Sequence, residues 1–365
     1  MTTVVVSGAV ANKHRYGGSI WVRMSWLEAL RALGFDVMFV EELRDGGDAG
    51  TFAAVMSELQ VPAALVAGDR IHGMTRDELL DRVEQAALLV NLSGHLRQPD
   101  LLRRIRKRVF VDLDPGYTHI WHAEGRDVGV ANHDHHFTVG LNVGTRGCSI
   151  PTNSVRWLPI RQPVVLERWP VVDEGFSAFT TVASWRGAFG PVAWNGRRYG
   201  VKAHQFRRFA RVPRLSRLPF AIALDLHPAD AQDRHLLLRN GWHLSDAASV
   251  ATPRSFAGFV RSSGAEFSVA QDVYVSTVSG WFSDRTVRYL ASGRPALVQE
   301  TGFSRTLPAG DGLLSFRTPR EAVARARDIV ERHDHHRRAA RTLAEEFFSP
   351  EHALAPLLET SGVAP

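Results

Sequence analysis

The chain has 365 residues, which corresponds to roughly two domains at about 150 residues each. Hydrophobic residues make up 44%, charged residues 22% and aromatic residues 9%, as in ordinary globular proteins, and this excludes a mainly disordered, collagenous or coiled-coil chain. The single cysteine, Cys148, excludes an intramolecular disulfide and a cysteine-based zinc cluster. Since no base stands beside it in the sequence, we expect Cys148 to be structural.

Lysine and arginine number 44 against 38 acidic residues, so the formal net charge is +6. This balance favours anionic partners, but no basic block interleaved with aromatic residues is present, so nucleic acid stays open without being the main expectation. No apolar run is long enough for a transmembrane segment, and the start of the chain predicts a buried strand instead of a signal peptide. We therefore expect a cytoplasmic protein.

Short apolar runs alternate with amphipathic stretches in the first part of the chain. The predicted strands cover residues 4–6, 35–40, 63–67, 88–92 and 109–111. The predicted helices cover residues 20–33, 77–85 and 99–106, the first being stopped by Gly34. Wholly apolar strands that alternate with helices predict a parallel sheet covered on both faces.

Residues 145–175 contain four prolines and show no hydrophobic period, and the same alternation starts again after them. The predicted strands then cover residues 179–184, 220–225, 266–269 and 295–299, and the predicted helices 202–210, 255–262, 283–291 and 320–332. We expect an N-terminal domain over residues 1–160, a linker over 161–175, a C-terminal domain over 176–344 and a last segment over 345–365.

Open parallel sheets bind ligands beyond the carboxyl ends of their strands, so the loops after strands are the informative ones. Gly17 and Gly18 follow the first strand and would let a ligand approach the backbone closely; an ordinary turn before a helix is the alternative. No GxGxxG accompanies them, which weakens a dehydrogenase interpretation. The GxSxG, Walker and HExxH motifs are also absent.

The most informative stretch is 276–316. Ser279, Gly280, Ser283 and Asp284 form a small polar entrance to a helix whose first turn would point N–H groups at a diphosphate. The following strand delivers three further residues, Thr301, Gly302 and Phe303, to the same edge of the sheet. The alternative is purely structural, with Ser283 or Asp284 as N-cap and Gly293 as helix stop.

The run ASGRPALVQETGF, the later GDGLLSF and the EAVARA helix together resemble the donor-binding half of GT-B glycosyltransferases. The first strand, the paired glycines and the helix ending in LRALGFDVMFVEEL are similar to the acceptor half of these enzymes. The resemblance implies an α/β fold of two Rossmann-like domains facing across a cleft, with a last helix around residues 345–358 that packs back on the N-terminal domain.

The resemblance also implies an activity, the transfer of a sugar from a nucleoside diphosphate such as UDP or TDP to an acceptor hydroxyl. The nucleotide sugar would be a co-substrate, with no metal and no other cofactor, and the acceptor a small molecule or glycan. By resemblance, Arg186 and Lys202 are the basic pair that holds the diphosphate, and Arg285 is a third candidate. A solvated surface pair is the alternative.

The chain departs from the family pattern at two positions. Gly280 and Arg288 stand where retaining enzymes carry the carboxylates of an E-x7-E motif, which leaves the retaining or inverting outcome open. Asp284 is a candidate replacement for the missing acid.

An inverting mechanism needs a base from the acceptor half. Asp114 and His95 follow predicted strands and are the candidates, although an Asp before Pro-Gly is often a turn former. The HDHH run at 133–136 is a weak metal candidate, because adjacent residues on a strand point to opposite faces. Two other functions stay open, a nucleotide-sugar epimerase of the same fold and a non-catalytic nucleotide-sugar or nucleic-acid binding protein.

Overall fold

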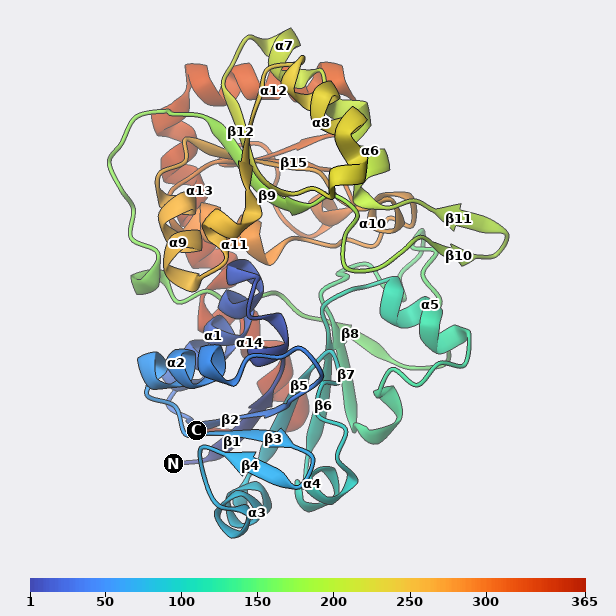
Figure 1. Cartoon of the computed structure of the whole chain (residues 1–365), viewed down its shortest axis with the longest axis vertical. Helices are drawn as coiled ribbons and strands as arrows, with labels where there is room; N and C mark the ends of the chain where they lie inside the picture. Colours follow the sequence, from blue (N-terminus) through green and yellow to red (C-terminus); the bar gives the residue numbers. More distant parts are fainter. The chain divides into compact units, whose positions relative to one another are not determined.

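The computed structural model describes residues 1–365, which divide into two compact units. Unit 1 comprises residues 1–144, 150–165 and 348–365, and unit 2 comprises residues 145–149 and 166–347. Each unit is built on one β-sheet with helices packed against it (Figure 1).

The sheet of unit 1 has eight strands in the order β4-β3-β2-β1-β5-β6-β7-β8, and all pairs are parallel except β3 with β4. The strands are β1 (Thr3–Ser7), β2 (Asp36–Glu42), β3 (Ala63–Ala67), β4 (Arg70–His72), β5 (Leu88–Leu92), β6 (Arg108–Asp112), β7 (His135–Thr138) and β8 (Trp157–Pro159). The helices are α1 (Gly17–Ala32), α2 (Ala49–Leu59), α3 (Arg76–Gln85), α4 (Pro99–Arg104), α5 (Tyr117–Ala123) and α14 (Pro350–Ser361), with the short 3-10 helices η1 (Ala11–Lys13) and η2 (Val130–Asn132).

Both faces of this sheet are covered. Leucines and valines of α3 and α4 pack on one face against the apolar side chains of β1, β2, β3 and β5. On the other side, α1 contacts β2, and α14 contacts both α1 and β7. The C-terminal segment is tied to unit 1 by the hydrogen bond from Val164 N to Phe348 O (2.8 Å).

The sheet of unit 2 has six parallel strands in the order β13-β12-β9-β14-β15-β16. The strands are β9 (Phe179–Ser184), β12 (Phe220–Asp225), β13 (Trp242–Asp246), β14 (Ala265–Ser268), β15 (Ala296–Gln299) and β16 (Leu313–Phe316), and β10 (Val192–Trp194) with β11 (Arg197–Tyr199) forms a separate hairpin. The helices are α6 (Lys202–Phe209), α7 (Val212–Ser216), α8 (Ala231–Leu238), α9 (Pro253–Arg261), α10 (Asp272–Ser276), α11 (Asp284–Ala291), α12 (Pro319–Glu331) and α13 (His333–Phe348), with 3-10 helices η3 (Leu166–Arg168), η4 (Pro228–Asp230), η5 (Ala247–Val250) and η6 (Phe303–Arg305).

An aromatic core fills one face of the unit 2 sheet. Phe179, Phe220 and Phe267 are completely buried and meet apolar residues of α6, α7, α8 and α12. On the other side, α11 contacts β14 and β15. In both sheets the chain order reverses beside the first strand, between β1 and β5 and between β9 and β14. These reversals are the positions where open parallel sheets bind ligands.

Several elements differ from the sequence-based expectation. The paired glycines lie inside the first turn of α1, not in a loop before it. α4 ends at Arg104, because Ile105 is already extended. The expected helix over 345–358 is two helices, since α13 runs to Phe348 and α14 starts at Pro350, where a proline fits the first turn.

Candidate active site

Arg285 fills the gap between β9 and β14. These strands pair only through Phe179–Ala265 and Thr180–Glu266 and carry no further paired residues toward their carboxyl ends. The guanidinium of Arg285 donates to Val182 O of β9 (2.9 Å), to Ser268 Oγ of β14 (2.9 Å) and to Glu266 Oε1 (2.7 Å). A cation is therefore fixed at the chain reversal of the unit 2 sheet.

Lys202, the first residue of α6, lies near this guanidinium. It is half-buried, and its ammonium makes no hydrogen bond or ion pair in the structure. Burial, and after it the charge of Arg285, lowers the pKa of Lys202 to about 7, against the opposing effects of Glu266 and Asp284. An unpaired ammonium beside a fixed guanidinium is suited to bind an anion.

A hydrogen-bond network fixes the start of α6. The carboxylate of Asp272 accepts from Gly200 N (3.0 Å), just before Lys202, and from Gln205 Nε2 (2.8 Å), one turn after it. Gln205 in turn accepts from Gln299 Nε2 (3.0 Å) of β15. The backbone that carries Lys202 is thus held on both sides, and Asp272 is a positioning residue that the sequence reasoning missed.

The loop at 279–283, between α10 and α11, and the loop at 300–303, after β15, lie together. Gly280 N donates to Thr301 O (2.8 Å), and Thr301 Oγ1 donates to Trp281 O (2.6 Å). Ser279 Oγ donates to Tyr274 O (3.2 Å), and completely buried Phe303 packs against Phe282. These side chains hold the two loops in place.

Ser283 caps α11, because its Oγ accepts from Arg285 N (3.3 Å), so the structural alternative holds for this residue. Gly302 has a positive φ of 94°, and its N–H donates to Glu300 Oε1 (2.7 Å). The part that these two loops take in nucleotide binding stays a prediction.

Asp284, the candidate replacement for the missing carboxylate, is ion-paired with Arg288. The Nη1 of Arg288 lies 2.6 Å from Asp284 Oδ2, one helical turn away on α11. The residue that stands in the expected glutamate position thus neutralises the nearest acid. Arg288 also stacks its guanidinium over the ring of Trp169 at 5.9 Å.

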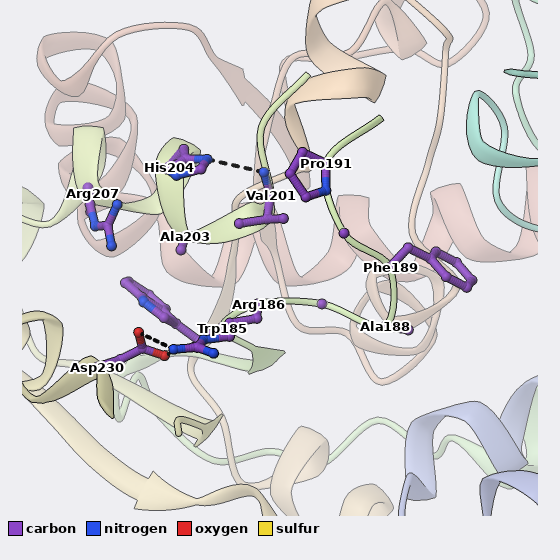
Figure 2. A pocket seen from close by; sticks show the side chains of 12 residues that line it. Trp185, Arg186, Ala188, Phe189, Pro191, Val201, Ala203, His204, Arg207 and Asp230 are labelled. Atoms are coloured by element: carbon purple, nitrogen blue, oxygen red, sulfur yellow. Dashed lines mark hydrogen bonds and ion pairs between the residues drawn. The ribbon is translucent and has the colours of Figure 1, made fainter. Parts of the chain in front are cut away.

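Arg186 follows β9 and comes close to the start of α6, because Ala203 N donates to Trp185 O (3.0 Å). It makes a two-pronged ion pair with Asp230 (2.9 and 3.0 Å), and its side chain is 57% exposed. Figure 2 shows this pair at a pocket of about 380 Å³ whose other walls include Val201 and Ala203 but not Lys202. The cation whose charge acts on Lys202 is Arg285. The role of Arg186 as a diphosphate ligand stays a prediction.

His95 follows β5 in unit 1, and its Nδ1 is buried without a partner. Burial lowers the pKa of His95 well below its ordinary value, and the charges of Arg23, Arg44, Lys13 and Arg97 lower it further. The imidazole is therefore neutral near pH 7 and can accept a proton. No motif in the sequence predicts that the charges of these four residues act on one histidine.

Asp114 follows β6 and takes part in a turn. Its backbone N donates to Asp112 Oδ1 (3.0 Å), and its carbonyl accepts from Thr118 N (3.3 Å). Asp112 is completely buried, and desolvation raises its pKa to about 6. Burial and the charge of Arg23 lower the pKa of Lys13, and the charge of Asp114 opposes this shift, so this carboxylate lies near the same ammonium that acts on His95.

Glu41, another residue that the sequence reasoning missed, organises the loop after β1. It is completely buried and accepts from the N–H groups of Val10 (2.7 Å), Ala11 (3.0 Å) and Asn12 (2.9 Å). Burial raises the pKa of Glu41, although the three hydrogen bonds by themselves would lower it. The sequence feature that could have indicated this role is the pair of acidic residues, Glu41 and Glu42, at the end of the apolar strand β2.

The histidines of the 133–136 run have separate partners. His133 Nε2 lies 3.1 Å from Asn91 Nδ2, and His136 Nε2 lies 2.8 Å from Val130 O. No group of three or more His, Cys, Asp or Glu side chains is placed to hold a metal ion.

None of the helices combines the length and apolar character needed to cross a bilayer.

By sequence, the chain matches no protein-family model and no curated protein. Its structure is similar to an α-glucosyltransferase in complex with UDP-glucose and DNA, with a TM-score of 0.63 at 10% identity over 99% of each chain. It is also similar to Anabaena HepE in complex with UDP-glucose (TM-score 0.58, 9% identity, 99% of this chain and 100% of that one). A sucrose-phosphate synthase from Thermosynechococcus elongatus gives a TM-score of 0.55 at 10% identity, over 99% of this chain and 98% of that one. The chain therefore has the GT-B glycosyltransferase fold of two Rossmann-like domains, and the predicted fold class is confirmed.

Proposed function

We propose that the protein is a glycosyltransferase that takes its sugar from a nucleoside diphosphate, with UDP as the first candidate nucleotide. The observation that carries the proposal is the unpaired, half-buried ammonium of Lys202 beside the guanidinium of Arg285 at the chain reversal of the unit 2 sheet. Two proteins of similar structure, an α-glucosyltransferase and Anabaena HepE, were solved with UDP or UDP-glucose, which supports this choice of nucleotide.

In the proposed reaction, the acceptor oxygen forms a bond to the anomeric carbon, and the bond from that carbon to the β-phosphate oxygen breaks. The diphosphate leaves with the electron pair, and the two fixed cations stabilise the negative charge that develops on it. Arg285 uses three of its five N–H donors internally, so donors remain for a phosphate. On this basis we propose that no metal is required.

The acceptor is assigned to unit 1. His95 would take the proton of the acceptor hydroxyl if the reaction inverts the anomeric centre, because its imidazole is neutral and its Nδ1 has no partner. Asp114 is the alternative base. With Gly280 and Arg288 at the two E-x7-E positions, we favour an inverting reaction that uses a base from unit 1.

Calorimetric titration with UDP, TDP, GDP and ADP tests the donor site. We expect one nucleotide to bind at micromolar concentration and Lys202→Ala to weaken its binding at least tenfold, or roughly 1.4 kcal/mol. Arg186→Ala tests the second predicted diphosphate ligand. Arg76→Ala is the matched control and should change affinity less than twofold, because Arg76 is exposed on α3 of unit 1. If no nucleoside diphosphate binds at millimolar concentration, the proposal fails.

Product analysis separates the remaining alternatives. The protein is incubated with the sugar nucleotide that binds, first without an acceptor and then with a panel of sugars, sugar phosphates and DNA. An epimerase would convert the sugar without any acceptor, whereas a transferase would give a new glycoside and free nucleotide. Binding without turnover across the whole panel would indicate a non-catalytic protein.

A further inference from the structure

Four cations surround one imidazole in unit 1. Lys13 ends η1 after β1, Arg44 follows β2, Arg97 follows β5 two residues after His95, and Arg23 reaches the same region from α1. The loops that carry Lys13, Arg44 and Arg97 are in contact, because Arg44 N donates to Asn12 Oδ1 (2.8 Å) and Gln98 N donates to Glu42 Oε1 (2.8 Å). The charge of each of the four cations acts on His95. We refer to Lys13, Arg23, Arg44 and Arg97 as the basic cluster. Its members lie far apart in sequence and meet because β2, β1 and β5 are neighbours in the sheet.

Two members of the basic cluster are fixed by protein groups. Arg23 donates from Nη1 to Ser19 O (3.0 Å) and Ser19 Oγ (2.9 Å), which holds its guanidinium at the first turn of α1. Arg97 donates from Nε to Gly94 O (2.7 Å) and pairs with Asp127 at 3.0 Å. These contacts fix the guanidinium groups of Arg23 and Arg97 before any ligand binds.

The other two members are not paired. The side chains of Lys13 and Arg44 make no hydrogen bond or ion pair in the structure. Lys13 Nζ lies over the ring of Tyr16, 5.8 Å from its centroid. Lys13 is half-buried, so its ammonium has lost part of its hydration. Such a cation gains most from an anionic ligand.

Two of the nearby carboxylates, Glu41 and Glu42, accept hydrogen bonds from backbone N–H groups instead of pairing with these two cations. Glu41 directs its oxygens at three backbone N–H groups, and Glu42 Oε1 accepts from Arg97 N and Gln98 N. Asp114 is the acid whose charge is felt by Lys13. The first turn of α1, next to Arg23, has no side-chain cap, so its N–H groups add to the positive character of the region.

We propose that the basic cluster binds a phosphate monoester carried by the acceptor, with Lys13 and Arg44 as its direct ligands. The inference rests on the proposed function, since it names the class of acceptor for the same site. Convergence of the cations on one half-buried imidazole fits a compact dianion, whereas a nucleic-acid backbone would need cations in an extended row. A bound dianion would also raise the basicity of His95 and so prepare it to accept the hydroxyl proton.

The experiment records the ring resonances of His95 by NMR while inorganic phosphate, and then glucose 6-phosphate, is added. The resonances are assigned by their loss in His95→Gln. Lys13→Gln and Arg44→Gln remove the two direct ligands. Arg76→Gln is the matched control, since Arg76 is exposed on α3 and makes no side-chain hydrogen bond or ion pair. All titrations are repeated in a Lys202→Ala background, which removes the donor site of unit 2.

We expect phosphate to shift the His95 resonances and to bind at least tenfold more weakly to Lys13→Gln and Arg44→Gln, with no change in Arg76→Gln or Lys202→Ala. Absence of the shift, or equal weakening in Arg76→Gln, would overturn the proposal. Binding of an oligonucleotide that depends on Lys13 and is not displaced by phosphate would overturn it in favour of nucleic acid. Titration of the same proteins with UDP tests the donor site separately. A negative result with phosphate therefore rejects the phosphate site without rejecting the proposed glycosyltransferase function.

Discussion

Arg285 donates to Glu266 over 2.7 Å, and the carboxylate that receives this bond is completely buried in the sheet of unit 2. The pair joins the start of α11 to β14, while the other nitrogens of the same guanidinium reach β9. One side chain thus holds two strands together at the place where the donor is proposed to bind.

Glu266→Gln should strongly destabilise unit 2. The substitution leaves the guanidinium of Arg285 buried without its counter-charge, which typically costs about 3–5 kcal/mol. Urea unfolding measures the effect, with Glu78→Gln as control, because Glu78 forms an exposed pair with Arg82 and should lose less than about 1 kcal/mol. A loss below about 1 kcal/mol in Glu266→Gln would show that the buried pair is not needed.

The affinity for UDP should fall as pH rises above 7. Lys202 has a pKa of about 7 in the free protein, and a diphosphate would favour its protonated form, so binding takes up protons near and above this pH. Calorimetry in buffers of different ionisation enthalpy measures the uptake, which should disappear in Lys202→Met. Equal uptake in wild type and Lys202→Met would assign the protons to another group.

Lys202 should also cost folding stability at neutral and lower pH. Its pKa is lower in the folded than in the unfolded chain, so the unfolded chain binds more protons between pH 7 and about 10 and stability from this group rises over that range. Lys202→Met should therefore raise the melting temperature at pH 6 and raise it less at pH 9. A lower melting temperature at pH 6 would contradict the assignment.

Asp112 in unit 1 should change the free energy of unfolding in the opposite direction with pH. Burial raises its pKa to about 6, above the unfolded value, so its contribution to stability is complete below about pH 4 and is lost as pH rises through 6. Relative to wild type, Asp112→Asn should gain roughly 3 kcal/mol in free energy of unfolding between pH 4 and pH 7. Unfolding curves at the two pH values test this, and parallel pH profiles would refute it.

Val278→Gly should stabilise the loop that leads to α11. Val278 has a φ of 55°, a left-handed conformation that costs a branched residue about 1–2 kcal/mol and glycine almost nothing. The side chain is only half-buried, so little packing is lost. We expect a gain of about 1 kcal/mol in chemical unfolding, while the control Val275→Gly in helix α10 should lose about that amount.

The alternation of apolar strands and helices was readable from the sequence because burial on both faces of a parallel sheet imposes it residue by residue. The ranges 179–184 and 220–225 agree with β9 and β12 at both ends, and Ser283 is the predicted cap of α11. The strands β7, β8 and β13 were missed, since they are short or partly polar and lie at or near sheet edges.

What the sequence could not decide is which charged groups meet. Arg186 follows β9 and pairs with Asp230 at the surface, whereas Arg285 lies in the first turn of α11 and enters the gap between β9 and β14. The basic cluster around His95 likewise combines residues that follow β1, β2 and β5. Local periodicity determines where strands and helices form, whereas the partners of a long charged side chain depend on strand order and on the desolvation that tertiary packing imposes.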